Sequence, residues 1–159
     1  MKKYELTAEF IEKWGKKLFR IKALISFGSV EVGELGGYVE KEDNLAQDGN
    51  AWVYGNARVC GDAEVYGDAW VCGDADYLLI GRIGSRFSFT TFFKNKDKGI
   101  TVSCGCFLGT IAEFRAKVSD THGNNKHAKI YNLAADRAEL QILGEEYFDK
   151  LNTNKSEPF

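Results

Sequence analysis

A run of hexapeptides is the feature of this sequence that most restricts how it can fold. From residue 44 the chain reads NLAQDG, NAWVYG, NARVCG, DAEVYG and DAWVCG, and then DADYLL. A period of six, with small and aliphatic residues two apart, predicts strands of about three residues separated by turns. Glycine at the end of a hexad suits a turn that other residues resist. We therefore predict that residues 38–79 form a short left-handed parallel β-helix of about two coils.

The period also predicts which side chains stack on one another. Three hexads complete one coil, which places Trp52 over Trp70. The other predicted columns are Tyr54 over Cys72, Asn56 over Asp74, and Glu40, Arg58 and Asp76 in one line of alternating charge, which favours this register. The predicted inward positions are Ala51, Val53, Ala57, Val59, Ala63, Val65, Ala69, Val71 and Ala75. Before them the pattern weakens, because Lys41 and Gln47 stand where Val is expected.

The register predicts an aromatic outer face on the coils. Trp52, Tyr54 and Trp70 point outward, together with Cys72. An exposed aromatic patch of this kind is typical of interfaces. Three interpretations stay open: a packing site for a terminal segment, an interface between copies in a homo-oligomer, and a platform for a ligand.

The flanking segments predict a mixed fold around the repeat. Residues 1–37 form an N-terminal β cap, either as two short strands that turn near Gly15 or as one or two helical turns. Residues 80–151 form a C-terminal α+β unit, made of a β-hairpin and two helices, and residues 152–159 form a flexible tail. In the hairpin, FSFTTFF turns through KNKDKG into ITVSCGCF.

Alternation sorts the side chains of the predicted hairpin into two faces. One face is apolar and is expected to pack in the core: Phe87, Phe89, Phe93, Ile100, Val102, Cys104 and Cys106. The other face is polar: Arg86, Ser88, Thr90, Thr101, Ser103 and Gly105.

Two helices are predicted after the hairpin. Thr110 with Glu113 forms a capping box, and that helix continues to about residue 120, with Gly123 as its stop. A second helix is expected over residues 126–143 and ends at Gly144.

Composition excludes several classes of protein. The 159 residues carry a net charge of −2, so no overall basic field is present to attract nucleic acid. No segment is apolar over about 18 residues, and no secretory signal is present at the start of the chain, so neither a membrane span nor export is expected. The four cysteines are therefore predicted to be reduced thiols in the cytoplasm.

Two cysteines and a histidine are candidates for a chemical site. Cys104 and Cys106 lie one residue apart, whereas zinc-binding pairs are usually two to four residues apart. We therefore predict buried structural thiols, no metal and no cofactor. A nucleophilic thiol paired with His122 stays an alternative. His122 is the one candidate for a catalytic base, and capping of a helix end is its other interpretation.

The segment from the hairpin into the first helix is a candidate site for an anion. Backbone N–H groups at a helix start bind anions, and Arg86 would add a cation. The predicted ligand-binding residues are Arg86, Ser88, Thr90, Thr101, Ser103, Gly105, Gly109 and Thr110. An ordinary capped helix is the other interpretation of the same residues.

The hexads resemble those of the hexapeptide-repeat, left-handed β-helix superfamily, whose best-known members are acyltransferases, usually homotrimers with active sites between subunits. Those enzymes carry a catalytic His in or near the coil, and no hexad here contains one. With KYELT, LGGYVEKEDNL, IGSR, CGCFLGTIAEF and THGNN, the wider arrangement also resembles small proteins carried by phages and prophages of Gram-positive bacteria. That resemblance implies a role in the bacterial host cell, where some phage proteins inhibit defence by sequestering nucleotide signals.

Three hypotheses for function follow from the residues and the resemblance. The first is a non-catalytic homo-oligomer, a trimer or another multiple, that binds a small anionic ligand such as a nucleotide. The second is a scaffold or inhibitor that binds a host protein through the Trp52/Trp70 face. The third is an acyltransferase of the hexapeptide type with His122 as its base.

Overall fold

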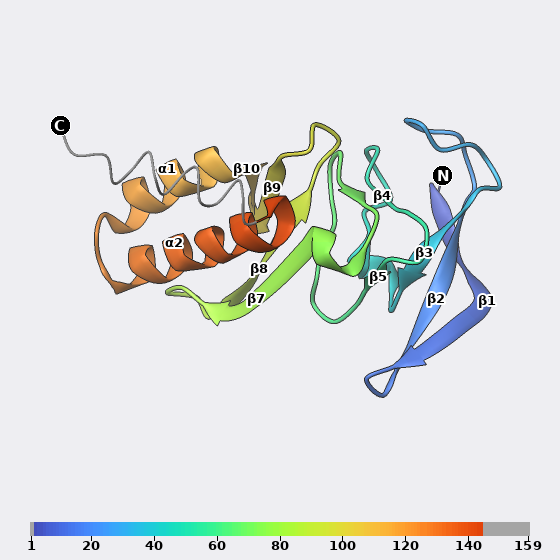
Figure 1. Cartoon of the computed structure of the whole chain (residues 1–159), viewed down its shortest axis with the longest axis horizontal. Coiled ribbons are helices and arrows are strands. Elements are labelled where there is room, and N and C mark those ends of the chain that lie inside the picture. The colour runs from blue at the N-terminus through green and yellow to red at the C-terminus, as the bar shows by residue number, and fades with distance from the viewer. Residues whose placement is uncertain (1, 145–159) are drawn as a thin grey trace.

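A computed structural model describes residues 2–144 of the chain and shows two regions along one long axis (Figure 1). The N-terminal region holds strands β1 to β3 and the hexads. The C-terminal region holds strands β7 to β10, with helices α1 and α2 at the far end of the molecule.

The N-terminal sheet has the strand order β1-β2-β3-β5. β1 (Tyr4–Lys13), β2 (Lys16–Ala23) and β3 (Leu35–Val39) pair antiparallel, and β5 (Arg58–Val59) joins β3 in parallel. The first two strands turn through Gly15, whose φ is +73°, a conformation that glycine adopts without strain. The prediction of two strands around this glycine is confirmed, and the helical alternative is wrong.

Within the hexads, one stretch of the predicted register is confirmed. β4 (Trp52–Val53) pairs in parallel with β6 (Trp70–Val71), which sets Trp52 beside Trp70. The backbone N–H groups of Trp52 and Tyr54 donate to the carbonyls of Ala69 and Val71 at 3.1 and 2.8 Å. All the predicted inward residues are buried except Ala75, which lies exposed in a 3₁₀ turn over Asp74–Asp76.

The predicted fold class, a left-handed parallel β-helix over residues 38–79, is wrong. Among the described residues, parallel pairing is confined to two pairs of short strands and one bridge between Leu45 and Val65, and the other strand pairs are antiparallel. A regular coil would repeat one offset. Here Trp52 and Trp70 are 18 residues apart, whereas Leu45 and Val65 are 20 apart.

Apolar residues explain the change of offset. Val39 lies opposite Val59, and Leu45 lies opposite Val65, so these side chains are buried in place of Lys41 and Gln47. Burying an aliphatic side chain is worth about 1.5–3 kcal/mol, whereas Lys41 or Gln47 would lose hydration at the same inward positions. The extra two residues fall between Leu45 and Trp52.

The predicted column of alternating charge is also wrong, because the same shift moves Glu40 away from Arg58. Arg58 lies opposite Tyr38 and forms an ion pair with Asp74. Glu40 instead accepts a hydrogen bond from the backbone N–H of Gly61 at 2.6 Å.

The C-terminal sheet is entirely antiparallel, in the order β10-β9-β8-β7. Its strands are β7 (Tyr77–Ile83), β8 (Ser88–Lys94), β9 (Ile100–Cys104) and β10 (Phe107–Thr110). The predicted hairpin corresponds to β8 and β9 and is confirmed. β7 and β10 add a strand on each side of it, which the sequence analysis did not predict.

Both predicted helices are present. α1 (Ile111–His122) begins with the predicted capping box, in which the Thr110 hydroxyl accepts from the Glu113 N–H at 3.2 Å, and it ends at Gly123 with φ +60°. α2 (Lys126–Ala138) continues as a π-helix over Glu139–Leu143 and ends at Gly144. The predicted tail, residues 152–159, lies outside the described residues, as does the end of the C-terminal unit after residue 144.

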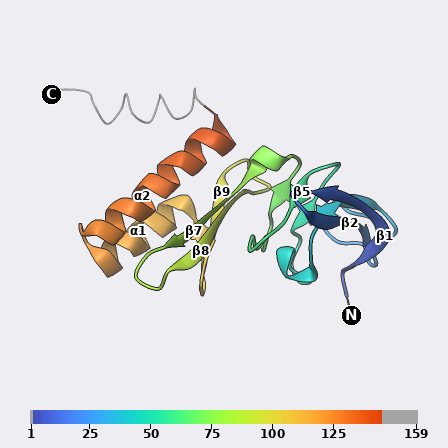
Figure 2. The ribbon, with the colours of Figure 1, turned by 90° about the horizontal axis from the view of Figure 1, so that it is seen from below.

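Two hydrophobic cores share the C-terminal sheet. Phe93 packs with the Ala and Val residues of the hexads, while Phe92 packs with α1 and α2. Figure 2 shows the helix pair on one side of β7–β9 and the N-terminal region beyond the other. The sheet is therefore covered on both faces.

This double cover corrects the predicted faces of the hairpin. Thr90 pairs with Cys104, and Phe92 pairs with Val102, so the polar residue of one strand shares a face with apolar residues of the next. The predicted apolar face, with Phe89 and Phe93 beside Val102 and Cys104, is wrong. Alternation marks an exposed face only when one face of a sheet meets solvent.

Candidate functional site

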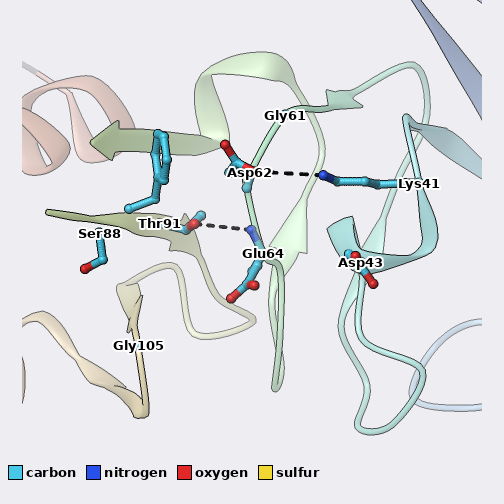
Figure 3. Close-up of a pocket in the computed structure, with 10 residues that line it drawn as sticks. Lys41, Asp43, Gly61, Asp62, Glu64, Ser88, Thr91 and Gly105 are labelled. Atoms are coloured by element: carbon cyan, nitrogen blue, oxygen red, sulfur yellow. Dashed lines mark hydrogen bonds and ion pairs between the residues drawn. The ribbon is translucent and has the colours of Figure 1, made fainter. Parts of the chain in front are cut away.

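Two cavities of similar size lie where the hexads meet the β8–β9 hairpin. The first, here called the acidic cavity, has a volume of about 320 Å³ (Figure 3). It is lined by Lys41, Asp43, Gly61, Asp62, Ala63, Glu64, Ser88, Phe89, Thr91 and Gly105.

The lining of the acidic cavity does not suit an anion. Three carboxylates face one lysine, whose Nζ lies 3.9 Å from the carboxylate of Asp62. The backbone N–H of Glu64 donates to the Thr91 hydroxyl at 3.2 Å, which ties the hexads to the hairpin (Figure 3). Ser88 and Gly105, two residues predicted to bind an anion, lie here beside carboxylates that would repel it.

The second cavity, here called the Trp70 cavity, has a volume of about 310 Å³ and the opposite charge. Its lining residues are Trp70, Cys72, Asp76, Lys94, Asn95, Lys96 and Lys98. Three lysines face one carboxylate. Asp76 is already engaged, since it accepts the backbone N–H groups of Cys72 and Gly73 at 2.8 and 3.1 Å.

Asn95 gives the lysine-bearing turn its shape. Its side-chain oxygen accepts from the backbone N–H groups of Asp97 and Gly99, each at 3.0 Å, and its amide nitrogen donates to the Thr101 hydroxyl at 3.0 Å. Asn95 also forms a β-bridge with Ala69, directly before Trp70. The turn is thus fixed against the hexads, and its lysines are held beside the indole ring.

Trp70 supplies an exposed aromatic wall. Its side chain is 40% exposed and stacks on the ring of Tyr54, with 5.3 Å between ring centroids and 26° between planes. At the same cavity, burial raises the pKa of the Cys72 thiol and Asp76 raises it further, while Trp70 and Lys94 oppose that rise. The thiol therefore remains protonated at neutral pH.

The lysines of the Trp70 cavity differ in their partners. Lys96 lies 3.9 Å from the carboxylate of Asp68, and its backbone N–H donates to the Asp68 carbonyl. Within residues 2–144, Lys94 and Lys98 form no ion pair. Two positive charges next to an aromatic wall can bind a small anion that carries a planar ring.

The structure does not bring the predicted anion-binding residues together. Thr90 is buried on the helix side of the sheet, and Thr101 and Ser103 are buried on the opposite side. Arg86 lies in the exposed turn after β7, and Thr110 is occupied as the cap of α1. Gly109 lies opposite Val102 in the sheet, and Thr110 lies opposite Thr101, but Thr101 is buried and cannot reach a ligand.

The candidate base His122 lines neither cavity. Its ring stacks on Tyr131, 5.8 Å between centroids, and lies 5.5 Å from the ring of His127. Cys104 lies on the same side of the sheet and accepts a hydrogen bond from the Thr90 hydroxyl at 3.2 Å. Among residues 2–144, no group of three or more His, Cys, Asp or Glu side chains is placed to hold a metal ion.

The predicted aromatic face is divided in the structure. Trp52 is fully buried, in edge-to-face contact with Tyr4 and Phe27, so it is not part of an exposed aromatic face. The N-terminal segment covers it, which was one of the open interpretations. Tyr54 is half-buried, and Trp70 alone presents its ring to solvent.

The lysines of the Trp70 cavity stand in the predicted hairpin turn KNKDKG, where the local pattern indicates a solvated hairpin tip. Lys94, Lys96 and Lys98 occupy alternate positions around a turn, and only the pairing of Ala69 with Asn95 brings them to Trp70. That contact joins segments 26 residues apart and leaves no local pattern.

No protein-family model matches this sequence, and no curated protein is significantly similar to it. None of the helices within residues 2–144 has the length and apolar character needed to cross a lipid bilayer.

Proposed function

We propose that this chain is a non-catalytic binding protein for a small anion with a planar ring, of which nucleotides are the natural class. The observation that carries the proposal is the Trp70 cavity, where an exposed indole faces Lys94 and Lys98. This moves the predicted ligand site from the start of α1 to the junction of the hexads with the β8–β9 turn.

The chemistry of the cavity matches such a ligand in two parts. A base would stack on the free face of Trp70, whose other face rests on Tyr54. Stacking of a base on an aromatic side chain is worth about 1–3 kcal/mol. The phosphate would lie near Lys94, the last residue of β8, and Lys98, in the turn that Asn95 preorganises.

Isothermal titration of the purified protein with a panel of mono-, di- and cyclic nucleotides tests the proposal. Trp70→Ala should weaken binding by roughly tenfold or more, since 1.4 kcal/mol corresponds to a factor of ten. Lys94→Gln and Lys98→Gln should each weaken binding by roughly threefold to tenfold. Added salt should reduce the affinity of the parent protein more than that of the variant carrying both substitutions.

Matched variants separate binding from general effects. Trp14→Ala removes another exposed indole far along the chain, and Lys129→Gln removes an exposed charge on α2. Both should bind as the parent protein does. If no nucleotide binds at millimolar concentration, or if Trp70→Ala and Trp14→Ala bind equally well, this placement of the site is wrong.

The wider hypotheses extend this proposal. A homo-oligomer would repeat the cavity once per subunit, and native mass spectrometry would report subunit number and retained ligand together. The resemblance to phage proteins extends the ligand class to nucleotide signals of host defence in the bacterial cytoplasm. Binding of a host protein through the Trp52/Trp70 face is disfavoured because Trp52 is buried. Acyl transfer is disfavoured because the candidate base His122 lines neither cavity.

A further inference from the structure

A second site lies in the tight turn between β9 and β10. Cys104 pairs with Phe107, so Gly105 and Cys106 are the two loop residues of the hairpin. Gly105 has φ +59°, whereas Cys106 has no positive φ, which fits a type II′ turn with glycine first. All four cysteines are free thiols.

The turn brings two thiols within reach of one another. Cys104 and Cys106 are two residues apart, so their Cα atoms are separated by at most about 7 Å, and by less where the chain turns. A disulfide needs a Cα separation of about 4.4–6.8 Å. The turn therefore keeps Cys104 and Cys106 within the range of Cα separations that a disulfide can bridge.

The two thiols differ in access and surroundings. Cys106 is exposed to solvent and Cys104 is half-buried, so the prediction of buried thiols is wrong for Cys106. The Thr90 hydroxyl donates to the Cys104 sulfur at 3.2 Å, which fixes the orientation of that sulfur. Tyr131 lies against the same sulfur: burial raises the pKa of this phenol, and the Cys104 thiol raises it further.

We propose that Cys104 and Cys106 form a redox-active dithiol that exchanges with low-molecular-weight disulfides. The Cys106 thiolate attacks one sulfur of a disulfide RSSR, forming Cys106–SR and releasing RS⁻, which takes up a proton. The Cys104 thiolate then attacks the Cys106 sulfur and releases the second RS⁻. The dithiol loses two electrons and two protons, and one RSSR becomes two RSH.

The position of the turn gives this exchange a consequence. Gly105, between the two cysteines, lines the acidic cavity. A bond from Cys104 to Cys106 would restrict the backbone on that wall of the cavity. Thiol exchange at this turn does not depend on ligand binding at the Trp70 cavity.

Thiol mapping in a Cys60→Ser/Cys72→Ser background tests the proposal, because only the two thiols of the turn remain. After incubation with excess glutathione disulfide, the tryptic peptide of residues 99–115 should lose the mass of two hydrogens and carry no glutathione. Dithiothreitol should reverse the change. Two free thiols, or two stable glutathione adducts, would overturn the proposal.

Single variants in the same background test the assigned roles. Cys104→Ser should hold a lasting glutathione adduct on Cys106, since no second thiol can displace it. Cys106→Ser should react much more slowly at the half-buried Cys104. Equal rates in the two variants would refute Cys106 as the attacking thiol.

Thr90 is assigned as a positioning residue for Cys104. Thr90→Val should prolong the glutathione adduct on Cys106 in the parent dithiol, and Thr90→Ser should restore the rate. Circular dichroism and the melting temperature would be followed in each variant, so that a folding defect is distinguished from a slower exchange. An unchanged lifetime in folded Thr90→Val would remove Thr90 from the mechanism.

Discussion

The two hydrophobic cores of this molecule differ in the side chains and contacts that form them. In the N-terminal region, Ala and Val side chains of the hexads pack beneath Trp52, and strands of two residues are joined by backbone hydrogen bonds. In the C-terminal region, longer strands and two helices pack around the rings of Phe92 and Phe114. The first region depends on close approach of backbone segments, and the second depends on large side chains and helix caps.

Trp52→Ala should give the largest effect and tests how far the hexad core depends on one ring. Trp52 is fully buried between Tyr4 and Phe27, and its removal leaves a cavity that small neighbours cannot fill. We expect a loss of about 3–5 kcal/mol in the free energy of unfolding, measured by urea denaturation. Trp14→Ala, at a 66% exposed ring, should cost far less. Similar losses in both variants would contradict a core organised around Trp52.

Gly37→Ala tests whether the N-terminal region depends on close approach of backbone segments. An added Cβ at residue 37 would lie 2.5 Å from the Ala57 carbonyl oxygen and 2.7 Å from a methyl of Val53. We expect destabilisation of about 3 kcal/mol, because a backbone oxygen cannot move aside as a side chain can. Thermal unfolding followed by circular dichroism would measure it.

Gly73→Ala is the matched control for that substitution. Gly73 has an extended φ of −152°, and nothing lies within 4 Å of an added Cβ. The free energy of unfolding of the Gly73→Ala variant should equal that of the parent protein within experimental error. If Gly37→Ala were equally silent, the close approach of β3 to the hexads would not limit stability.

The comparison also shows what the sequence could predict. Regular elements with local signals were predicted correctly: the β8–β9 hairpin from its alternation, and α1 from Thr110 and Glu113. The side-by-side placement of Trp52 and Trp70 followed from the period of the hexads. Each of these signals lies within one element or one repeat.

The errors came from long-range competition between residues. Leu45 takes the inward position that the period assigned to Gln47, and this shift breaks the regular coil. The predicted faces of the hairpin were wrong because Phe92 and Phe93 are both buried, on opposite sides of the C-terminal sheet. The lysines meet Trp70 only through pairing between distant segments, so the candidate site could not be found from local patterns.

A pH titration of stability tests a buried charge in the N-terminal region. The Nζ of Lys3 donates to the carbonyls of Asp48, Gly49 and Ala51, and the residue is 1% exposed. Burial lowers the pKa of this amine from 10.5 to about 8, against the opposing effect of Asp48. The unfolded chain therefore binds more protons than the folded chain between these two values, and stability should rise with pH above 8.

Lys3 alone should add about 2 kcal/mol between pH 8 and pH 10, since one proton contributes at most about 1.4 kcal/mol per pH unit, and the raised pKa of the Cys72 thiol offsets part of this gain. Above pH 10 the trend should reverse, because burial raises the pKa of Tyr4 and Tyr77 and the folded state then holds protons that the unfolded chain has lost. Urea denaturation across this range would show both slopes. In Lys3→Met the rise between pH 8 and 10 should disappear; a rise of unchanged size would assign it to another group.

Thr110→Ala should give the smallest effect. It tests how much the N-terminal cap of α1 contributes to the stability of the C-terminal region. The Thr110 hydroxyl accepts from the Glu113 N–H, and the Glu113 carboxylate accepts from the Thr110 N–H, each at 3.2 Å. Loss of the hydroxyl leaves a helix N–H without this partner, and solvent replaces part of the interaction because the cap is exposed. We expect a loss of about 1 kcal/mol in the free energy of unfolding. Thr121→Ala, near the exposed end of the same helix, should be neutral. If Thr110→Ala lowered the free energy of unfolding as much as Trp52→Ala does, the C-terminal region would depend on one local contact as strongly as the hexads depend on one ring. The contrast between the two cores would then be wrong.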